Sequence, residues 1–269
     1  MQGSWQSQVK NHLSTNRIQC SLQTPEVGSL GEFAPSKDYS YAFQAIINVA
    51  SSRIFSFEAL IRTKDNQPAE KVLNEIPQEG FYQFDMESRE HAIKLAAHLG
   101  LECNLNLNVL PLSLCRTPDC IDSVVETTRA SGLKTSQIVL ELLEDELMSD
   151  AERLFERAQH YRKTGITFAI DDFGAGFAGL RLLADFQPDY IKLDRHLIKS
   201  IHRDSVRQAI VEGVCHTCRN LVIQIVAEGV ESVDEYLWLR DREIFLFQGW
   251  LFAKPHFESL CADFFIPSS

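Results

Sequence analysis

The chain has 269 residues, of which 45% are hydrophobic, so it is long and apolar enough to bury the core of one large domain. Its formal net charge of −11 argues against general nucleic-acid binding, because such binding depends on a basic surface. No apolar run approaches the ~18 residues of a membrane span, and the N-terminus lacks the apolar segment of a secretory signal.

In chain order, a polar lead-in segment at 1–39 precedes one domain at 40–269 that alternates between strand-like and helix-like patterns. Runs rich in Ile, Val, Leu and Phe predict eight strands, at 42–49, 53–61, 103–110, 138–144, 166–172, 190–194, 222–230 and 244–252. Apolar residues at helical spacing predict helices at 84–100, 149–165, 204–218 and 232–241. This alternation is typical of an α/β domain.

The first two predicted strands are joined only by Ala-Ser-Ser at 50–52, so they should form an antiparallel hairpin. Most of the later strands are separated by helical patterns, which suits parallel pairing. We therefore predict an α/β fold, a TIM-like (β/α)8 barrel with one antiparallel strand near its start. An open, doubly wound sheet is the alternative, and the positions of the polar residues favour the barrel.

Polar side chains stand at or near the C-terminal end of strand after strand, where buried parallel strands are normally apolar. They are Glu58, Asn108, Glu141, Asp171, Asp172, Lys192, Asp194, Glu228 and Gln248. Each one alone is compatible with an ordinary solvated strand end. In a closed barrel, however, these strand ends meet at one face, where active sites are built. The repetition therefore favours a barrel with one polar pocket.

The oxygen-bearing side chains predict a site for hard divalent cations such as Mg²⁺, Mn²⁺ or Ca²⁺. The candidate ligands are Glu58, Asn108, Glu141, Asp171, Asp172 and Glu228. Adjacent aspartates allow one carboxylate to bridge two ions, the arrangement that activates water and binds a phosphoryl group. Lys192 would then orient or deprotonate the water or stabilise phosphate charge, and Arg62 would hold a second phosphate. Their ordinary interpretation is as surface cations, which fits Lys192 less well.

The stretch "FAIDDFGAGFAGL" at 168–180 has a second interpretation. From Gly174 it spells Gly-x-Gly-x-x-Gly after a predicted strand, and Asp194 follows twenty positions later, as in a dinucleotide-binding loop. However, Asp171 and Asp172 would repel a pyrophosphate unless a cation intervened, and the polar residues on the other strands would have no role. We therefore interpret the glycines as a tight loop beside metal ions rather than as a cofactor-binding loop.

Seven ordered motifs resemble those of the EAL-domain family, bacterial phosphodiesterases that cleave cyclic di-GMP. They are "FEALIR" (57–62), "NVLP" (108–111), "ELLED" (141–145), "DDFGAGFAGL" (171–180), "IKLD" (191–194), "AEGVE" (227–231) and "QGWLFAKP" (248–255). The resemblance runs from about Phe43 to Pro255, which is nearly the whole chain.

The resemblance implies hydrolysis of cyclic di-GMP to linear pGpG by a TIM-like barrel that binds two Mg²⁺ or Mn²⁺ ions and is often a homodimer. It implies a first metal site of Glu58, Asn108, Glu141 and Asp171, and a second of Asp171, Asp172 and Glu228. It implies catalytic roles for Lys192, Glu58, Asp171, Asp172 and the orienting Gln248. It implies substrate contacts at Gln44, Leu60, Arg62, Asn108, Asp194 and the supporting Glu231. It also implies a loop-stabilising role for Glu144.

The chain departs from the family pattern at places that are not metal ligands. Ala45 replaces a usual Pro, Thr63 a common Trp and Leu143 a common Thr, while "FAGL" at 177–180 replaces Tyr-Ser-Ser-Leu. The last two lie in or beside the loop expected to couple the metal site to the dimer surface. The alternative function is a low-turnover cyclic di-GMP-binding or protein-interaction module on the same fold. Because every matched ligand is present, we expect an enzyme.

The seven cysteines are scattered along the chain, as is typical of reduced thiols in a cytoplasmic protein. Cys215 and Cys218 have C-x-x-C spacing, but no second such pair accompanies them. Helical i, i+3 spacing places both thiols on one face of a helix, so we expect them to be buried structural residues.

Overall fold

The computed structural model describes residues 38–267, except 78–79, 111–120, 145–150 and 177–178. Residues 1–37 of the lead-in segment predicted at 1–39 therefore lie outside the described residues. The same holds for 177–178 of the "FAGL" departure. The first strand begins at Tyr39, close to the start of the domain predicted at 40–269.

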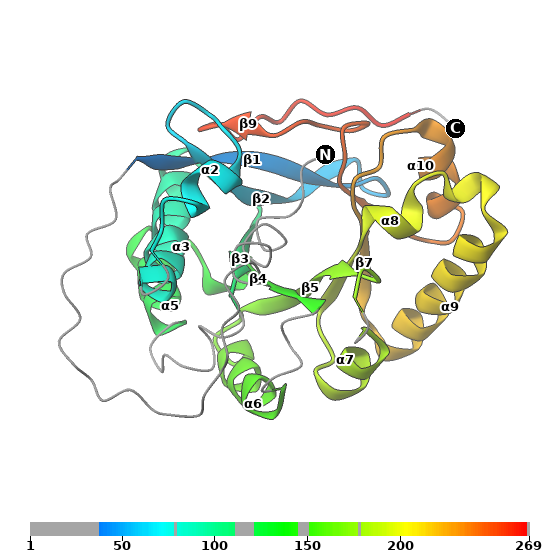
Figure 1. Ribbon diagram of the computed structural model, residues 1–269, viewed down its shortest axis with the longest axis horizontal. Helices are drawn as coiled ribbons and strands as arrows, with labels where there is room; N and C mark the ends of the chain where they lie inside the picture. The colour runs from blue at the N-terminus through cyan, green and yellow to red at the C-terminus, as the bar shows by residue number, and fades with distance from the viewer. Residues whose placement is uncertain (1–37, 78–79, 111–120, 145–150, 177–178, 268–269) are drawn as a thin grey trace.

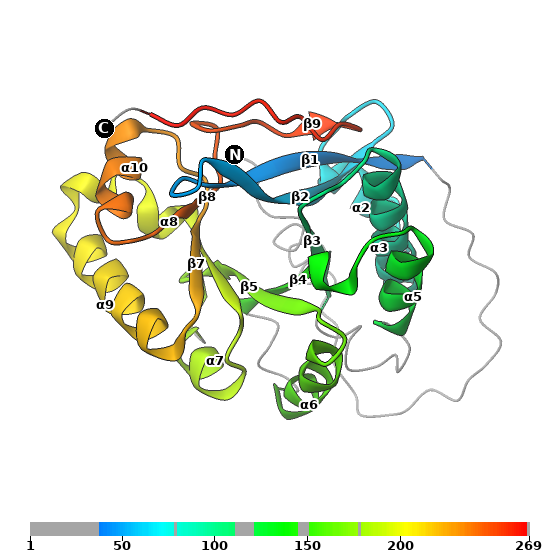
Figure 2. The ribbon, with the colours of Figure 1, turned by 180° about the vertical axis from the view of Figure 1, so that it is seen from behind.

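Eight strands form a closed barrel (Figure 1, Figure 2). They are β1 (Tyr39–Asn48), β2 (Arg53–Thr63), β3 (Asn104–Val109), β4 (Ile138–Leu143), β5 (Thr167–Phe173), β6 (Tyr190–Leu193), β7 (Gln224–Ala227) and β8 (Leu246–Phe247). Neighbours follow chain order from β2 to β8 in parallel pairs, and β1 closes the ring, antiparallel to both β8 and β2. The TIM-like barrel with one antiparallel strand near its start is confirmed.

The predicted hairpin between the first two strands is also confirmed. Asn48 supports its turn, because its side-chain Oδ1 accepts hydrogen bonds from the backbone N–H groups of Ala50 and Ser51, at 3.0 and 3.1 Å. The hairpin register sets Gln44 on β1 directly opposite Glu58 on β2. Two residues from the predicted site are therefore brought together by local pairing.

Helices surround the barrel, as Figures 1 and 2 show from opposite sides. They are α2 (Ala69–Leu73), α3 (Phe81–His98), α5 (Asp122–Ala130), α6 (Ala151–Arg162), α7 (Gly179–Asp185), α8 (Arg195–Ile198), α9 (Ser205–Leu221) and α10 (Val233–Arg240), with 3₁₀ turns at Thr135–Gln137 and Ile201–Arg203. The four predicted helices correspond to α3, α6, α9 and α10. The helices α2, α7 and α8 are too short to produce a periodic pattern, and α5 contains two Val and two Thr, which suit strands better.

The last two barrel strands are shorter than predicted, since β7 ends at Ala227 rather than 230 and β8 ends at Phe247 rather than 252. After β8 the chain leaves the barrel at Gly249, where an added Cβ would lie 2.1 Å from the Val230 carbonyl oxygen. The apolar residues that follow form a turn, which the strand pattern concealed. A short strand not predicted, β9 (His256–Phe257), pairs with β1 outside the barrel.

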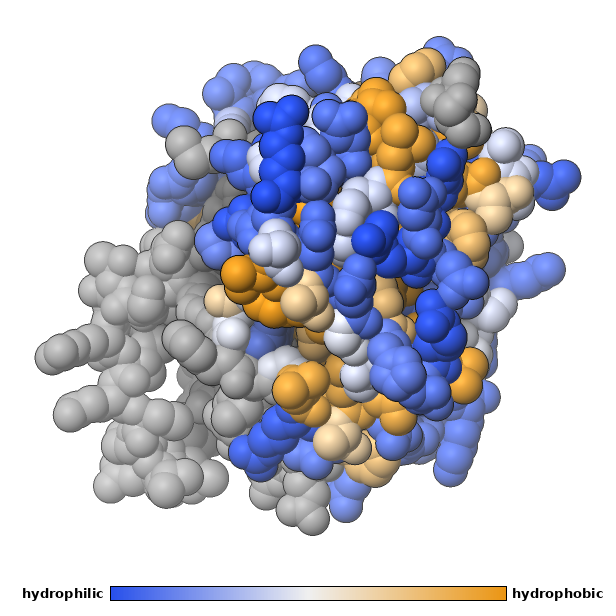
Figure 3. Space-filling view, turned by 90° about the vertical axis from the view of Figure 1, so that its right-hand side faces the viewer, coloured by the Kyte–Doolittle hydropathy of each residue, from blue (hydrophilic) through white to orange (hydrophobic). Residues whose placement is uncertain are grey.

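The burial of individual residues can be compared with the expectations from the sequence. Cys215 and Cys218 are buried on α9, as expected. Among the described residues, no helix combines the length and apolar character that crossing a membrane would require. Figure 3, which looks onto the side of α9 and α10, shows apolar patches separated by hydrophilic side chains. The exposed apolar residues include Leu180 on α7 and both Val206 and Ile210 on α9.

Candidate active site

The predicted site residues gather at one mouth of the barrel because they stand on, or directly after, seven neighbouring strands, most of them near the carboxyl end. Glu58, Asn108, Glu141, Asp171, Asp172 and Lys192 lie on β2 to β6, while Glu228 and Gln248 directly follow β7 and β8. In a strand, alternate side chains point to the same side. Residues that share the inward side therefore converge on the barrel axis, although they are spread over nearly the whole domain.

Lys192 lies at the centre of this convergence, with its side chain only 1% exposed. Its Nζ is 2.6 Å from Glu228 Oε1, 2.9 Å from Glu141 Oε1, 3.1 Å from Asp171 Oδ1 and 3.3 Å from Glu58 Oε2. One ammonium group thus contacts four carboxylates from four strands or strand ends. If all four were ionised, the buried cluster would carry an excess of three negative charges.

The pKa values of these groups show the shortage of positive charge. Burial raises the pKa of Glu141 and Glu228 well above the ordinary value, and raises the pKa of Asp171 to about 7, although Lys192 opposes all three shifts. For Glu58, burial also raises the pKa, but Lys192, Gln248 and Asn108 outweigh it and the net shift is downward. Burial lowers the pKa of Lys192, but its carboxylate neighbours outweigh that effect and raise it.

Side-chain amides support Glu58 from two sides. Asn108 Nδ2 donates to Glu58 Oε1 at 3.3 Å, and Gln248 Nε2 donates to Glu58 Oε2 at 2.7 Å. Gln44 lies next to Gln248, with Gln248 Nε2 3.4 Å from Gln44 Oε1, and its own Nε2 donates to the Ala253 carbonyl. The residues Gln44, Asn108 and Gln248, all predicted from the sequence, are therefore in contact with Glu58 or with one another.

Asn106 belongs to the same cluster and was missed by the sequence-based prediction. Its Nδ2 donates to Glu141 Oε1 at 2.7 Å, and the residue is buried. The signal was present, because "NLNLN" at 104–108 places asparagines two residues apart, and alternate residues of a strand share a side. The repeated Asn could therefore have indicated a polar layer that extends below Asn108.

A β-bulge explains how two consecutive aspartates reach one site. Neighbouring residues on a regular strand point to opposite sides. The pairing of β5 with β6 is irregular between Ile170 and Phe173, so that Asp171 and Asp172 together oppose Lys192. Asp172 has a φ of +52°, a left-handed conformation that Asp tolerates better than most residues. Carboxylate oxygens of Asp171, Asp172 and Glu228 consequently lie within 4.8 Å of one another.

The residues present fit divalent cations. Among the described residues, Asn108 Oδ1 and Asp171 Oδ2 are buried oxygens for which no hydrogen-bond partner is found. Buried oxygens of this kind are costly unless something satisfies them. Together with the carboxylates of Asp172 and Glu228, they provide hard oxygen donors, which Mg²⁺, Mn²⁺ and Ca²⁺ prefer. The excess negative charge of the cluster favours the same ligands.

An apolar layer lies below the polar one. Ile46, Val226 and Leu246 form a small buried cluster, with Phe55 and Tyr190 packed against it. Ile46, Val226 and Leu246 each lie two residues from Gln44, Glu228 or Gln248 and so share the inward side of their strands. This layer closes the barrel beneath the site and lowers the local dielectric constant, which strengthens electrostatic interactions there.

Glu144 holds the glycine loop that follows the aspartates. Its Oε2 accepts from the N–H groups of Gly174 and Gly176 at 2.7 and 3.4 Å, and its Oε1 accepts from Gly179 N–H at 2.7 Å. These are the donors that a dinucleotide-binding loop would offer to a pyrophosphate. Because a carboxylate of the chain itself already occupies them, the structure disfavours the alternative interpretation of this stretch.

Three predicted substrate contacts lie at the border of the cluster. Leu60 and Arg62 share the inward side of β2 with Glu58, and the Arg62 guanidinium donates to the Ile61 carbonyl at 2.7 Å. Burial lowers the pKa of Arg62, while nearby Glu58 raises it. Asp194 caps α8, because its Oδ1 accepts from His196 N–H at 2.7 Å. In the part of the chain that the structure describes, no hydrogen bond or ion pair joins these three residues to Lys192.

Glu231 has a structural partner that the sequence did not suggest. Arg195 Nη2 lies 2.7 Å from Glu231 Oε2, and its Nη1 donates to the Gly229 carbonyl. On the other side, Glu235 Oε2 accepts from the Glu231 N–H at 3.1 Å and also from the Ser232 N–H at 3.1 Å, the latter as part of the capping box of α10. Arg195 and Glu235 therefore fix the short loop that begins with Glu228.

Sequence comparisons identify relatives of the whole barrel. The model of the family described as "EAL domain" matches residues 32–255. The blue light- and temperature-regulated antirepressor BluF of Escherichia coli is 36% identical over 222 residues, which cover 82% of this chain and 55% of BluF. The probable cyclic di-GMP phosphodiesterase PdeN of Escherichia coli is 28% identical over 235 residues, which cover 81% of this chain and 44% of PdeN. The chain thus spans about half the length of these curated relatives.

Solved structures show the same fold. Klebsiella pneumoniae BlrP1, in a manganese and cyclic di-GMP complex, aligns with a TM-score of 0.80 and 40% identity, covering 83% of this chain and 57% of that one. A standalone EAL protein from Vibrio cholerae O395, in its cyclic di-GMP-bound form, aligns with a TM-score of 0.80 and 40% identity, covering 84% of this chain and 95% of that one.

Proposed function

This chain belongs to the EAL-domain family, and from that premise we propose that it is a metal-dependent phosphodiesterase that hydrolyses cyclic di-GMP to linear pGpG. The observation that carries the proposal is the cluster around Lys192, in which three buried carboxylates and the partly exposed Glu228 contact a single ammonium group. A structural ion pair needs one partner for each charge. An excess of acidic oxygens at the mouth of a barrel suits a site that receives cations and a phosphate ester.

We assign Glu58, Asn108, Glu141 and Asp171 to the first cation, and Asp171, Asp172 and Glu228 to the second. Bound Mg²⁺ or Mn²⁺ would supply a Lewis acid and lower the pKa of a coordinated water. The protein groups then have separate tasks. Lys192, within hydrogen-bond reach of four of the ligands, holds a proton at Nζ and offers it to oxygen atoms at the centre of the site. Gln248 orients Glu58 through its 2.7 Å hydrogen bond.

The substrate side of the proposal uses the residues of the rim. Arg62 provides a guanidinium group on the same side of β2 as Glu58, where it would bind the phosphate that is not cleaved. Gln44, Leu60 and Asp194 border the same opening. Glu231 is proposed to support the site through Arg195 and the Glu228 loop. Glu144 would keep the glycine loop in one conformation beside Asp172.

BluF supports a second candidate, because this relative of 36% identity is named an antirepressor rather than an enzyme. On that model, the barrel would bind cyclic di-GMP or a protein with little turnover. The two candidates differ in what the intact cation site does. An interaction module does not require all six cation ligands and Lys192, whereas the phosphodiesterase does.

A product assay distinguishes the two candidates. Purified protein is incubated with cyclic di-GMP and either Mg²⁺, Mn²⁺ or Ca²⁺, and pGpG is measured by chromatography. We expect cleavage with Mg²⁺ and Mn²⁺, and binding without efficient cleavage with Ca²⁺, which accepts a larger and less regular coordination. Cyclic di-GMP that is bound but remains intact with Mn²⁺ over hours would support the interaction module instead.

The variant Glu58→Ala tests the cation assignment. We expect it to lose turnover while the barrel stays folded, because Glu58 contacts polar groups at the mouth rather than the apolar core. Circular dichroism serves as the folding control. Unchanged turnover in this variant would refute the role of Glu58.

We also propose that the barrel at 40–269 acts as the catalytic domain and that two copies associate as a homodimer.

A further inference from the structure

A buried ion pair on α3 lies outside the cluster at the barrel mouth. Asp85 and Arg89 have side chains 0% and 2% exposed, and Arg89 Nη1 is 2.5 Å from Asp85 Oδ2. The same buried side of the helix carries Phe84, Ala92 and Ile93. Burying two charges costs several kcal/mol per ion, and an apolar pair of similar volume often gives equal or greater stability. The presence of this pair therefore calls for a reason other than stability.

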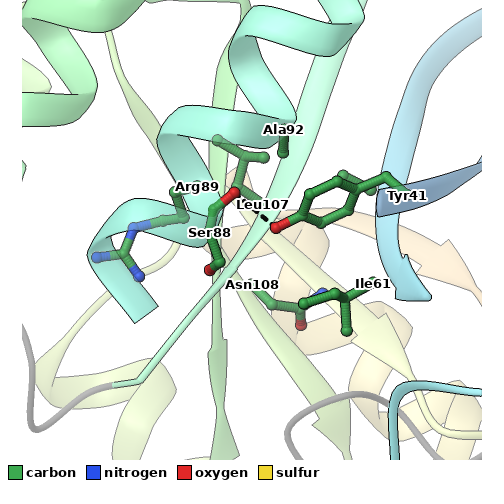
Figure 4. A pocket seen from close by; sticks show the side chains of 8 residues that line it. Tyr41, Ile61, Ser88, Arg89, Ala92, Leu107 and Asn108 are labelled. Atoms are coloured by element: carbon green, nitrogen blue, oxygen red, sulfur yellow. Dashed lines mark hydrogen bonds between the residues drawn. The ribbon is translucent and has the colours of Figure 1, made fainter. Parts of the chain in front are cut away.

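The pair reaches the end of β3, the strand that carries Asn108. Asp85 Oδ1 accepts a hydrogen bond from the Leu110 backbone N–H at 3.4 Å, and Leu110 is two residues beyond Asn108. Arg89 and Asn108 also line one small cavity between α3 and the barrel wall (Figure 4). Asp85 thus contacts the backbone two residues beyond a residue of the proposed cation site.

The helix turn that carries the charges is itself fixed to the barrel. Tyr41 on β1 donates its hydroxyl hydrogen to the Ser88 carbonyl at 2.5 Å, as Figure 4 shows, and Ser88 Oγ donates to the Asp85 carbonyl at 2.9 Å. Tyr41 and Ser88 are both buried. Because α3 is held by β1 and in turn holds the end of β3, displacement of either charged residue would be transmitted to β3.

We propose that Asp85 and Arg89 are positioning residues for Asn108, and through it for the first cation; the identity of the cation rests on the proposed function. Asn108 Oδ1, buried and without a hydrogen-bond partner among the described residues, has to point at the ion from a fixed strand end. Asp85 fixes that end at Leu110, and the contact with Arg89 orients the Asp85 carboxylate. Partners behind a ligand commonly change metal affinity by about 10–100-fold when they are removed.

The test is the double substitution Asp85→Leu/Arg89→Met, which replaces the pair by apolar side chains of similar size. Because no charge is left unpaired, we expect it to fold with a melting temperature near that of the wild type. Mn²⁺ binding is measured without substrate, from the electron paramagnetic resonance signal of free Mn²⁺. We expect a loss of affinity of about tenfold. Wild-type Mn²⁺ affinity in the folded double variant would overturn the proposal.

A second variant, Arg89→Lys, keeps the positive charge but loses the planar guanidinium group. We expect a smaller loss of Mn²⁺ affinity than in the double variant. If the double variant does not fold, Arg89→Lys is the deciding variant, and wild-type Mn²⁺ affinity in its folded form would contradict the proposal. Adding Asn108→Ala to the double variant should cause no loss beyond that of Asn108→Ala alone, since both act on one ligand. Additive losses would show that the pair does not act through Asn108.

The matched control is Arg162→Met, which breaks the ion pair of Arg162 with Asp189 at 3.4 Å. Arg162 ends α6 and Asp189 directly precedes β6, so this pair lies at the end of the barrel away from the site. We expect this variant to lower the melting temperature and to bind Mn²⁺ like the wild type. Mn²⁺ binding is measured without cyclic di-GMP. Failure of this inference would therefore appear as unchanged Mn²⁺ affinity in the variants, whereas failure of the proposed function would appear as absence of cleavage by the wild type.

Discussion

At the residue scale, Lys192 is the side chain on which most contacts of the site depend. Replacing it by Met removes the ammonium group from three buried carboxylates and from the partly exposed Glu228. We expect turnover to fall by about 10²–10⁴-fold, the usual contribution of a positioned proton donor or acceptor. Without metal, we also expect a loss of stability of about 3 kcal/mol, because buried carboxylates lose their counter-ion.

Steady-state cleavage and thermal melts in EDTA and in Mn²⁺ would measure both effects of Lys192→Met. Added Mn²⁺ should restore part of the lost stability, because a cation replaces the missing charge. The control is Lys64→Met, since Lys64 pairs with Asp38 at 3.6 Å on the exposed surface and should affect neither quantity. Wild-type turnover in Lys192→Met would contradict the catalytic role.

Burial raises the pKa of Asp171 to about 7. From this we predict that the stability of the metal-free protein and the stabilisation by Mn²⁺ change in opposite directions with pH. Between its ordinary pKa and about 7, the folded protein binds more protons at Asp171 than the unfolded chain, so metal-free stability falls as pH rises. Glu141 and Glu228, whose pKa values burial also raises, act in the same direction. Cations require the ionised carboxylates, so stabilisation by Mn²⁺ should instead grow as pH rises.

Melting temperatures with EDTA and with Mn²⁺, at about pH 6 and about pH 8, would check this prediction. The increase on adding Mn²⁺ should be larger at the higher pH. An increase that is independent of pH would mean that Mn²⁺ does not compete with protons at these carboxylates. Asp172→Asn, which removes one ligand on the exposed side of the cluster, should reduce the increase at both pH values.

The sequence predicted residue types at this scale well, because each polar side chain interrupts an apolar strand. It did not predict the bulge at Asp171 and Asp172, since a bulge depends on pairing with β6 rather than on local composition. Nor did it predict that Arg195 binds Glu231, which lies in a different βα loop. Contacts between distant strand ends depend on barrel closure, which no local pattern contains.

At the element scale, the turn after β8 controls where Gln248 points. Gly249 lies against the loop after β7, and an added Cβ would be 2.1 Å from the Val230 carbonyl oxygen and 2.4 Å from its nitrogen. Backbone atoms cannot move aside as flexible side chains do. We therefore expect Gly249→Ala to displace Gln248 from Glu58 and to lower turnover by about 10²-fold, as misplacement of a site by about 1 Å commonly does.

Gly213→Ala is the matched control for Gly249→Ala. Gly213 lies within α9, and nothing would lie within 4 Å of an added Cβ. Alanine is the better helix former there, so the control should gain up to about 1 kcal/mol in stability and keep its activity. Kinetics and thermal melts of both variants are needed. Full activity in Gly249→Ala would show that the turn does not position Gln248.

Elements with strong local signals were predicted, and those defined by tertiary contacts were not. The hairpin at 50–52 and the helix at 232–241 both rest on local sequence signals, and both are confirmed. The lengths of β7 and β8 were overestimated, because Val230 and Trp250 continue the apolar pattern beyond the last ladder pair. Beyond that pair, the backbone hydrogen bonds join the loop after β7 to the loop after β8. For example, the Leu251 N–H donates to the Val230 carbonyl.

At the scale of the whole molecule, β1 is the element that closes the barrel. It pairs with β2 on one side and with β8 on the other, and it carries Gln44 next to Gln248. Tyr39 and Tyr41, near its start, are buried in the core, and Tyr39 is the first residue of the strand. The closure of the barrel, and with it the site, therefore depends on the chain from this position onward.

Two truncations test this dependence. A chain that begins at Asp38 keeps all of β1, so we expect it to match the full chain in melting temperature, Mn²⁺ binding and cleavage. A chain that begins at Ala50 lacks β1 and leaves the facing edges of β2 and β8 unpaired, so we expect it to aggregate or remain unfolded. Light scattering on the full chain checks the proposed homodimer, because a dimer would have about twice the monomer mass of 30.5 kDa. If the chain from Asp38 instead lost cleavage while keeping its fold, residues before β1 would have to contribute to catalysis, and the domain boundary would have to move toward the N-terminus.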